Sequence, residues 1–392
     1  MNILIYRWDI FPYNDIIETL QNEGHHLDVL DFVLDYNSHN EAFEQIFSQK
    51  VLSCHYDAVF SINYFTIISD LCHHFHIKYI SWTCDAPLLS MRHPSVNNSE
   101  NKIYLFDKSE YNYFISKKLS TVDYLPLAGN PQRIQKQLKN IKPEYKYDLS
   151  FVGNLYDKNR YDELVSVIPD YICGYMDAAI EAQLNVSGGN LLPKMLTDEI
   201  ISLLEPYIRL EKEALSSSDL SLHLATSVLS NKTAAIMRKL YLNSLAEFCD
   251  VNLFTTSDTS DLTGVNVHPP VRYADEMPLV FAQSKININM TIPNIENGIP
   301  LRVFDILSAS GIVLTDYREE TLEFFEPDTD LVVYDGLEDM LAKALYYLKN
   351  DTKRELIARN GYNKLCKFHT YKNRLGSCFK EISILYFHQL SL

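Results

Sequence analysis

Short apolar segments alternate with helical segments along the first 125 or so residues, and this alternation constrains the fold more than any other feature. Residues 2–6 (NILIY), 58–62 (AVFSI) and 78–82 (KYISW) are apolar enough for buried strands. The segments around them have the spacing of amphipathic helices and comprise residues 13–23, 39–53 and 65–76. Strands that alternate with helices predict a parallel sheet covered by helices on both faces.

The same alternation resumes near residue 148. Strands are predicted there at residues 148–153, 251–254, 286–290, 312–314 and 331–334. Residues 170–245 look mostly helical, which is longer than a crossover between two parallel strands needs. We therefore expect a second α/β domain that carries a helical insertion.

A chain of 392 residues exceeds one ordinary hydrophobic core and suggests two domains. The predicted parts are a Rossmann-like domain over 1–130, a polar linker over 131–147, a second Rossmann-like domain over 148–350 with its insertion at about 170–245, and C-terminal helices over 351–392. No G-x-G-x-x-G follows the first strand, which disfavours dinucleotide binding by the first domain.

The charge balance restricts the partners. The net charge is −16, and an acidic surface argues against nucleic-acid binding. Residues 349–374 are the local exception, because they hold eight lysines and arginines against two acidic residues. This segment is either a solvated helix face or a weak contact with an anionic membrane surface.

Several features favour a cytoplasmic protein. No stretch approaches the roughly 18 apolar residues of a membrane span. The first residues lack the basic start and long apolar region of a signal peptide. The seven cysteines are odd in number and widely spaced, which indicates a reducing compartment.

Residues 298–316 (GIPLRVFDILSASGIVLTD) combine a turn, a helix and a strand. Pro300 suits the start of a helix because its missing N–H is not needed there. The free N–H groups at such a helix start, together with the helix dipole, favour an anion such as phosphate. Arg302 and Asp305 lie one turn apart in this helix, where Asp305 could accept a hydrogen bond from a ribose.

This segment resembles the nucleotide-sugar-binding half of GT-B glycosyltransferases. The similarity is greatest to the spore-maturation-protein-like branch of the glycosyltransferase group 1 superfamily, a bacterial group with a usual, uncharacterised N-terminal half. The resemblance extends over residues 58–87, 103–130, 148–156, 272–316 and the tail at 368–374 (FHTYKNR). It implies two Rossmann-like doubly wound domains that face a cleft, with the acceptor on the first domain and the donor on the second. It also implies a last helix that crosses back to the first domain.

Members of this superfamily carry two glutamates, eight positions apart, that contact the donor sugar and the ribose. The corresponding residues of this chain are Asn297 and Asp305. Aspartate can still accept from ribose hydroxyls, whereas asparagine carries no charge. Glu296 is adjacent and could take the role of the first glutamate.

The predicted donor site collects residues from three segments. Gly153 and Asn154 end a strand where the diphosphate lies in related folds, and Lys158 could neutralise phosphate charge. Asn289 and Thr291 alternate to one side of a strand end. The remaining predicted donor residues are Glu296, Asn297, Gly298, Ile299, Leu301, Arg302 and Asp305. The alternative for each segment is a local structural role, such as an ordinary strand-to-helix turn, an asparagine cap or a surface ion pair.

Two aspartates are candidates on the acceptor side. Asp85 follows a first-domain strand and could act as a general base, and Asp9 follows the first strand. The alternative is that both cap the next element. Arg302 is the second predicted catalytic residue, because a cation can stabilise the departing diphosphate without a metal. No metal ligands are assigned, since adjacent histidines of the HHFH stretch at 73–76 would point apart on a helix.

The sequence thus predicts a metal-independent glycosyltransferase of the hexosyltransferase type, with no cofactor. It would transfer a sugar from a nucleotide diphosphate sugar, with UDP favoured, to a protein or glycan acceptor. Two alternatives stay open. One is a nucleotide-sugar epimerase or hydrolase on the same fold, and the other is a non-catalytic scaffold, which Asn297 in place of a glutamate would suit.

Overall fold

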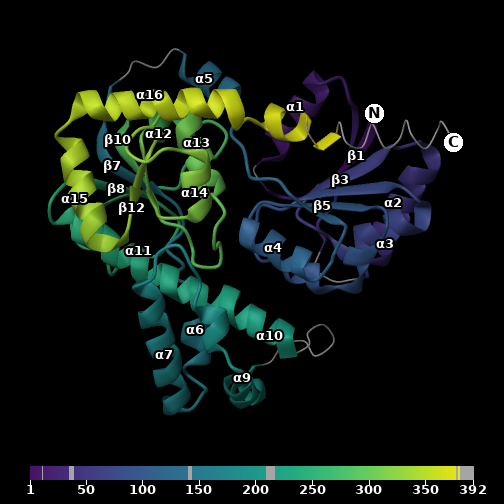
Figure 1. The fold of residues 1–392 in the computed structure, drawn as a ribbon, viewed down its shortest axis with the longest axis horizontal. Helices are drawn as coiled ribbons and strands as arrows, with labels where there is room; N and C mark the ends of the chain where they lie inside the picture. The colour runs from purple at the N-terminus through teal and green to yellow at the C-terminus, as the bar shows by residue number, and fades with distance from the viewer. Residues whose placement is uncertain (11, 35–38, 140–143, 209–216, 377, 380–392) are drawn as a thin grey trace. The chain divides into compact units, whose positions relative to one another are not determined.

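The computed structural model describes residues 1–392 except 11, 35–38, 140–143, 209–216, 377 and 380–392. The chain forms two compact units (Figure 1). Unit 1 comprises Met1–Arg133 together with Leu365–Leu392, and unit 2 comprises Ile134–Lys364. Each unit contains one six-stranded parallel sheet, as the alternation of strands and helices predicts.

The sheet of unit 1 has the strand order β2-β1-β3-β4-β5-β6. Its strands are β1 (Asn2–Arg7), β2 (His26–Asp31), β3 (Ala58–Ile62), β4 (Lys78–Trp82), β5 (Asn101–Leu105) and β6 (Val122–Tyr124). The main helices are α1 (Tyr13–Asn22), α2 (Glu41–Ser53), α3 (Thr66–Phe75) and α4 (Lys108–Ser116), with short turns η1 (Leu89–Arg92) and η2 (Pro94–Asn97). All five residues of β3 are buried, as expected for a central strand covered on both faces.

The sheet of unit 2 has the strand order β12-β11-β10-β7-β8-β9. Its strands are β7 (Tyr147–Val152), β8 (Val251–Phe254), β9 (Asn266–His268), β10 (Ser284–Asn289), β11 (Val313–Asp316) and β12 (Val332–Tyr334). Because β7 comes first along the chain and lies beside β10, the strand order reverses between these two strands. Ligands of open α/β sheets bind outside the carboxyl ends of the strands at such a reversal.

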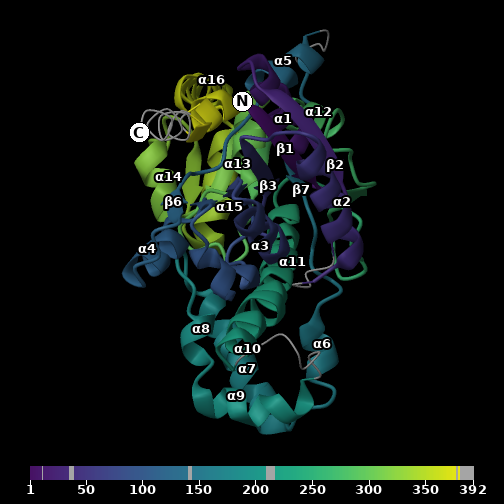
Figure 2. The ribbon, with the colours of Figure 1, turned by 90° about the vertical axis from the view of Figure 1, so that its right-hand side faces the viewer.

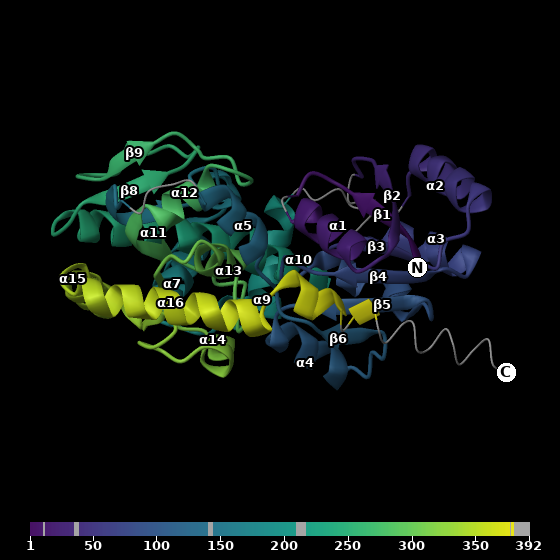
Figure 3. The ribbon, with the colours of Figure 1, turned by 90° about the horizontal axis from the view of Figure 1, so that it is seen from above.

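Helices pack against both faces of this second sheet. They are α11 (Asn231–Ala246), α12 (Met277–Ala282), α13 (Leu301–Ser308), α14 (Glu319–Phe324), α15 (Gly336–Leu348) and α16 (Asp351–Phe368). Figure 3 shows α16 as one continuous helix. The last residues of this helix belong to unit 1, where Gly129 and Thr370 form a β-bridge and the rings of Trp82 and Tyr371 lie 6.0 Å apart.

A group of helices between β7 and β8 extends away from the sheet of unit 2 (Figure 2). It contains α6 (Arg160–Leu164), α7 (Asp170–Leu184), α8 (Leu192–Met195), α9 (Asp198–Leu204), η3 (Glu205–Tyr207), α10 (Ser217–His223) and the π-helix η4 (Leu224–Ser230), which leads directly into α11. These helices enclose an apolar core of their own, built around residues such as Ile172, Met176 and Leu224. The helical insertion predicted from the sequence is therefore present.

Three details differ from the expectations. Strand β9 was not predicted, because it is a largely exposed edge strand of three residues. Within the stretch predicted as a linker, Pro131–Leu138 form helix α5, and residues 140–143 lie outside the described residues. Pro300 is the N-cap of α13 rather than its first residue. No helix in the described parts of the chain is both long and apolar enough to cross a membrane.

Candidate functional site

Arg238 lies at the strand reversal of unit 2, at the carboxyl ends of β7 and β10. Its guanidinium donates to the backbone oxygen of Asn154, just after β7, and to the backbone oxygen of Met290, just after β10, at 2.7 Å for the latter. One side chain thus bridges the two strand ends between which the order reverses. This is the position at which ligands bind in open α/β sheets.

Helix α11 brings Arg238 to this position because the residue lies on the buried face of the helix. Ala234, one turn earlier, and Leu242, one turn later, are both fully buried, and Tyr241 is 6% exposed. Residues four apart lie on the same side of a helix. The apolar face of α11 therefore packs against the sheet and carries an arginine in its middle.

The guanidinium of Arg238 is a buried cation whose charge and hydrogen-bond donors are only partly satisfied by the protein. The residue is 8% exposed, and its Nε has no hydrogen-bond partner in the described part of the chain. Its charged group lies 4.9 Å from the ring centre of Tyr156 and 5.3 Å from that of Phe151. Burial lowers the pKa of Arg238, the nearby negative charge of Asp316 raises it, and the positive charge of Arg302 lowers it by a smaller amount. A buried cation whose charge is only partly offset favours an anionic ligand.

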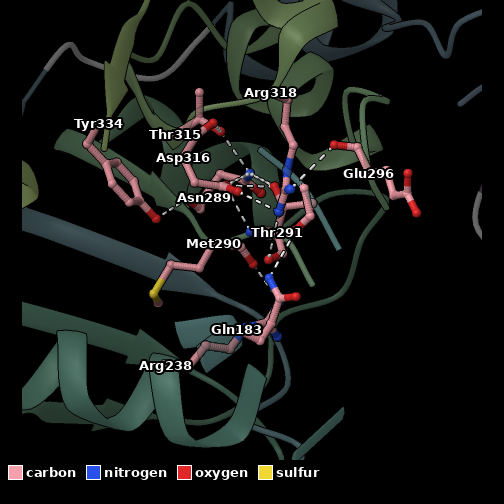
Figure 4. A network of polar contacts seen from close by, with 11 residues as sticks. Gln183, Arg238, Asn289, Met290, Thr291, Glu296, Thr315, Asp316, Arg318 and Tyr334 are labelled. Carbon is pink, nitrogen blue, oxygen red and sulfur yellow. Dashed lines mark hydrogen bonds and ion pairs between the residues drawn. The ribbon is translucent and has the colours of Figure 1, made fainter. Parts of the chain in front are cut away.

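A hydrogen-bond network beside Arg238 fixes the ends of β10 and β11 (Figure 4). The Asp316 carboxylate accepts from the backbone N–H of Thr291 at 2.9 Å and from the Thr291 hydroxyl at 2.7 Å. It also pairs with Arg318 at 2.9 Å. Asn289 donates to the hydroxyls of Thr291 and Thr315. Asn289 and Thr291, predicted as donor residues, therefore form internal hydrogen bonds that hold the strand ends.

The loop that leads to α13 carries the next predicted residues. Glu296 accepts from Arg318 through its backbone oxygen at 3.4 Å, and Asn297 donates to the Glu319 carboxylate at 3.2 Å. Gly298 and Ile299 are buried, and Leu301 is the first residue of α13. Asn297 thus lies at the surface of unit 2 in a polar contact with α14.

Arg302 and Asp305 form a pair within α13, with 3.8 Å between nitrogen and oxygen. Asp305 is 4% exposed and accepts a hydrogen bond from the Tyr273 hydroxyl at 2.8 Å. The Arg302 guanidinium lies over the ring of Phe281 at 5.6 Å and contacts the sulfur of Met277. These contacts give both residues a packing role, while the charge of Arg302 still influences Arg238.

Gly153, Asn154 and Lys158 lie at the carboxyl end of β7, as predicted. Gly153 donates its N–H to Phe254 of β8 at 3.1 Å. A Cβ at Gly153 would approach the Phe151 ring to 3.1 Å, so the residue is small for a packing reason. Asn154 and Lys158 line a cavity of about 290 Å³, with Tyr156, Asp157, Thr256 and Ser257 as the other lining residues.

Asp85 and Asp9 lie at the carboxyl edge of the sheet of unit 1. Asp85 follows β4, and its carboxylate accepts from the side-chain amide of Asn63 at 2.7 Å. Part of the Asp85 side chain reaches solvent, but the surrounding protein desolvates its carboxyl and raises its pKa. Asp9 follows β1 and is exposed. Strand β3 separates β1 from β4 in the sheet.

The described residues contain no cluster of three or more histidine, cysteine, aspartate or glutamate side chains that could hold a metal ion. The histidines of the HHFH stretch lie at the end of α3, where His73 pairs with Glu100 at 2.5 Å. This stretch therefore has an explanation in local structure.

The sequence prediction missed Arg238, Asp316 and Arg318. A signal for Arg238 was present, because an arginine interrupts the apolar face of a helix at residues 234–245. Asp316 was included in the predicted strand end without a role. No motif spacing identifies Arg318, because its place in the network depends on the tertiary approach of Thr291 and Glu296.

Sequence comparison found a similarity to a known family. Residues 238–379 match a sequence family described as "Glycosyl transferase-like". A comparison with curated proteins found no match.

Solved structures that resemble the chain share its architecture at low sequence identity. Sucrose-phosphate synthase from Thermosynechococcus elongatus is 9% identical, with 98% of this chain and 100% of that chain covered and a TM-score of 0.53. A glycosyltransferase from Rickettsia africae is 10% identical, with 98% of each chain covered and a TM-score of 0.53. An E. coli structure described as trehalose-6-phosphate bound with UDP-2-fluoro glucose is 9% identical, with 97% and 99% covered and a TM-score of 0.54. The chain therefore has the GT-B fold of glycosyltransferases, and its residues 238–379 are similar to the family described as "Glycosyl transferase-like".

Proposed function

We propose that this protein is a hexosyltransferase that transfers a sugar from a UDP-sugar to a protein or glycan acceptor. Unit 2 would bind the donor, and unit 1 would bind the acceptor. The observation that carries the proposal is the buried guanidinium of Arg238, which bridges the ends of β7 and β10 and keeps its Nε without a partner.

The charge at the strand reversal suits a diphosphate. Burying a cation whose charge is only partly offset costs free energy, and a bound anion would reduce that cost. Arg302 adds a second positive charge, and Lys158 offers a third at the end of β7. The N–H groups at the start of α13 would add donors for a phosphate oxygen.

The same groups would provide the catalysis. Transfer of the sugar leaves a nucleoside diphosphate that gains negative charge as the bond to the sugar breaks. Cations already held in place would stabilise that charge in the transition state more than in the ground state. Arg238 would therefore do what a divalent metal does in other phosphate sites, and we propose a metal-independent reaction.

The acceptor hydroxyl would need a base if the reaction inverts the sugar configuration. Asp85 is the candidate, since Asn63 holds its carboxylate in place and its raised pKa makes it a better base than a free aspartate. If the reaction retains the configuration, this base is not required. We also propose that the chain belongs to the spore-maturation-protein-like branch, so that Asp305 would contact the ribose and Glu296 or Asn297 the sugar.

The release of UDP tests this function. Purified protein would be incubated with UDP-glucose, UDP-galactose and UDP-N-acetylglucosamine, each with and without a pool of bacterial glycans and proteins. Release that depends on the acceptor would support a transferase. Release or a new nucleotide sugar without acceptor would indicate a hydrolase or an epimerase. Binding without turnover would indicate a scaffold, which the internal contacts of Asp305 would suit.

A further inference from the structure

A cavity of about 290 Å³ opens at the carboxyl ends of β7 and β8, beside the strand reversal that holds Arg238. Its lining comes from the segment after β7 and from the segment after β8. The six lining residues are Asn154, Tyr156, Asp157, Lys158, Thr256 and Ser257. Five of the six are polar or charged, and the sixth is an aromatic residue with a hydroxyl.

Tyr156 is fixed in position by its backbone and by its ring. The residue has a positive φ of 54°, a conformation that is costly for a side chain of this size. The backbone N–H of Tyr156 donates to the side chain of Asn154, and its carbonyl accepts from the side chain of Asn159 at 3.1 Å. The Arg238 guanidinium lies over the ring, 4.9 Å from its centre. A strained backbone conformation and a cation–π contact with Arg238 therefore fix the ring of Tyr156, which forms the aromatic wall of the cavity.

The polar groups around this wall are suited to hydroxyl groups. Although burial raises the pKa of Asp157, hydrogen bonds from the backbone of Asp258 and the side chain of Ser257 lower it overall, which keeps the carboxylate ionised. The Thr256 side chain is exposed, and no hydrogen bond of its hydroxyl is found among the described residues. The ammonium of Lys158 is exposed at the same rim.

We propose that this cavity is a subsite for a pyranose ring, which stacks on Tyr156 while its hydroxyls bind Asp157 and Thr256. An aromatic wall accepts the C–H face of a sugar, and carboxylate, amide and hydroxyl groups satisfy its polar edge. If the ring is the sugar of the donor, this proposal rests on the proposed function. A free saccharide would bind through the same groups whether or not the protein binds a UDP-sugar.

Calorimetric titration separates the two sources of the ring. Wild type would be titrated with UDP, UDP-glucose, UDP-galactose and UDP-N-acetylglucosamine, and then with the free monosaccharides. The variants are Tyr156→Ala, which removes the wall, Tyr156→Phe, which keeps it, and Thr256→Val, which removes one hydroxyl without touching Arg238. Tyr171→Ala is the control, because Tyr171 is 63% exposed on α7 and does not line the cavity.

The subsite predicts that one UDP-sugar, or one free monosaccharide, binds wild type through its sugar. Tyr156→Ala should weaken that sugar-dependent affinity about tenfold, while Tyr156→Phe and Tyr171→Ala retain it. Thr256→Val should also weaken the sugar-dependent affinity. If Tyr156→Ala does not fold, the result for Thr256→Val tests the subsite.

The opposing results are equally specific. The subsite is refuted if no sugar adds to the affinity of wild type, or if folded Tyr156→Ala and Thr256→Val bind the sugar as wild type does. UDP binding would then still support the proposed function. Conversely, binding of a free monosaccharide through Tyr156 without any binding of UDP would support the subsite and contradict the proposed donor.

Discussion

Asp305 is buried inside unit 2, where the Tyr273 hydroxyl donates to it at 2.8 Å and Arg302 lies 3.8 Å away. Replacing Asp305 by alanine would remove the Tyr273 hydrogen bond and the carboxylate that pairs with Arg302. We expect the free energy of unfolding to fall by about 1–3 kcal/mol, measured by urea denaturation. Asp275→Ala is the control, because Asp275 is half exposed in a surface ion pair and its removal should leave the stability close to that of wild type. Equal stability of Asp305→Ala and wild type would show that Asp305 has no structural role.

Asp85 should make the stability of the protein depend on pH. Desolvation raises the pKa of its carboxyl above the ordinary 3.8, so the native state holds this proton more tightly than the unfolded chain. The free energy of unfolding therefore contains a contribution that is present at low pH and is lost as the pH rises through the raised pKa. Asp85→Asn lacks this contribution. Denaturation at about pH 4 and about pH 7 should show the variant gaining stability relative to wild type at the higher pH, and a difference independent of pH would contradict the assignment.

Individual residues of the site were only partly predictable from the sequence. The segment that contains Arg302 and Asp305 could be recognised because its turn, helix and strand are contiguous. Arg238 is separated from Met290 by 52 positions, so the bridge between β7 and β10 exists only after the sheet has formed. The internal bonds of Asn289 and Thr291 were equally hidden, because their partner Asp316 lies on the next strand.

Helix α16 packs closely onto unit 2 at Gly361. A Cβ at this position would lie 2.2 Å from the backbone oxygen of Asp330 and 2.7 Å from the Leu307 side chain. Gly361→Ala must therefore displace the helix, and we expect a loss of about 1–3 kcal/mol in the free energy of unfolding. Gly174→Ala in α7 is the matched control, since nothing lies within 4 Å of its Cβ. That change should stabilise the protein by about 0.5–1 kcal/mol. The same response from both variants in thermal or urea denaturation would contradict this packing.

Helices and strands were predictable where the hydrophobic pattern was long. Apolar residues cluster or alternate along the central strands β3, β8 and β10, so the positions of these strands followed from the sequence. Strand β9 has no such run, because two of its three residues are exposed. At the end of α13, Ser310 and not the following glycine takes the left-handed conformation, with a φ of 57°. Gly311 is required instead for close packing, since its Cβ would lie 2.6 Å from the Asn287 side chain.

At the scale of the whole molecule, the two-sheet architecture followed from the alternation of strands and helices, which is a local property of the sequence. The GT-B fold was likewise predicted and is confirmed by solved structures of about 9% identity. The activity is harder to predict from the sequence, because one fold hosts many reactions. Any acceptor must be identified by experiment.

The proposed reaction should not require a divalent metal. Arg238, Arg302 and Lys158 would supply the positive charge that the departing diphosphate needs. We expect UDP release in the presence of excess EDTA to stay within about twofold of the untreated rate. Loss of turnover in EDTA that added Mg²⁺ or Mn²⁺ restores would contradict a metal-independent mechanism.

The most direct test is calorimetric titration of UDP and uridine into wild type, Arg238→Gln and Arg238→Lys. If the buried guanidinium binds the diphosphate, wild type binds UDP much more tightly than uridine. Arg238→Gln should lose most of that difference, about tenfold or more in affinity. Arg238→Lys should recover little of it, because an ammonium lacks the planar fork that bridges Asn154 and Met290. If folded Arg238→Gln binds UDP as wild type does, or if wild type binds no nucleotide, then Arg238 does not form a donor site.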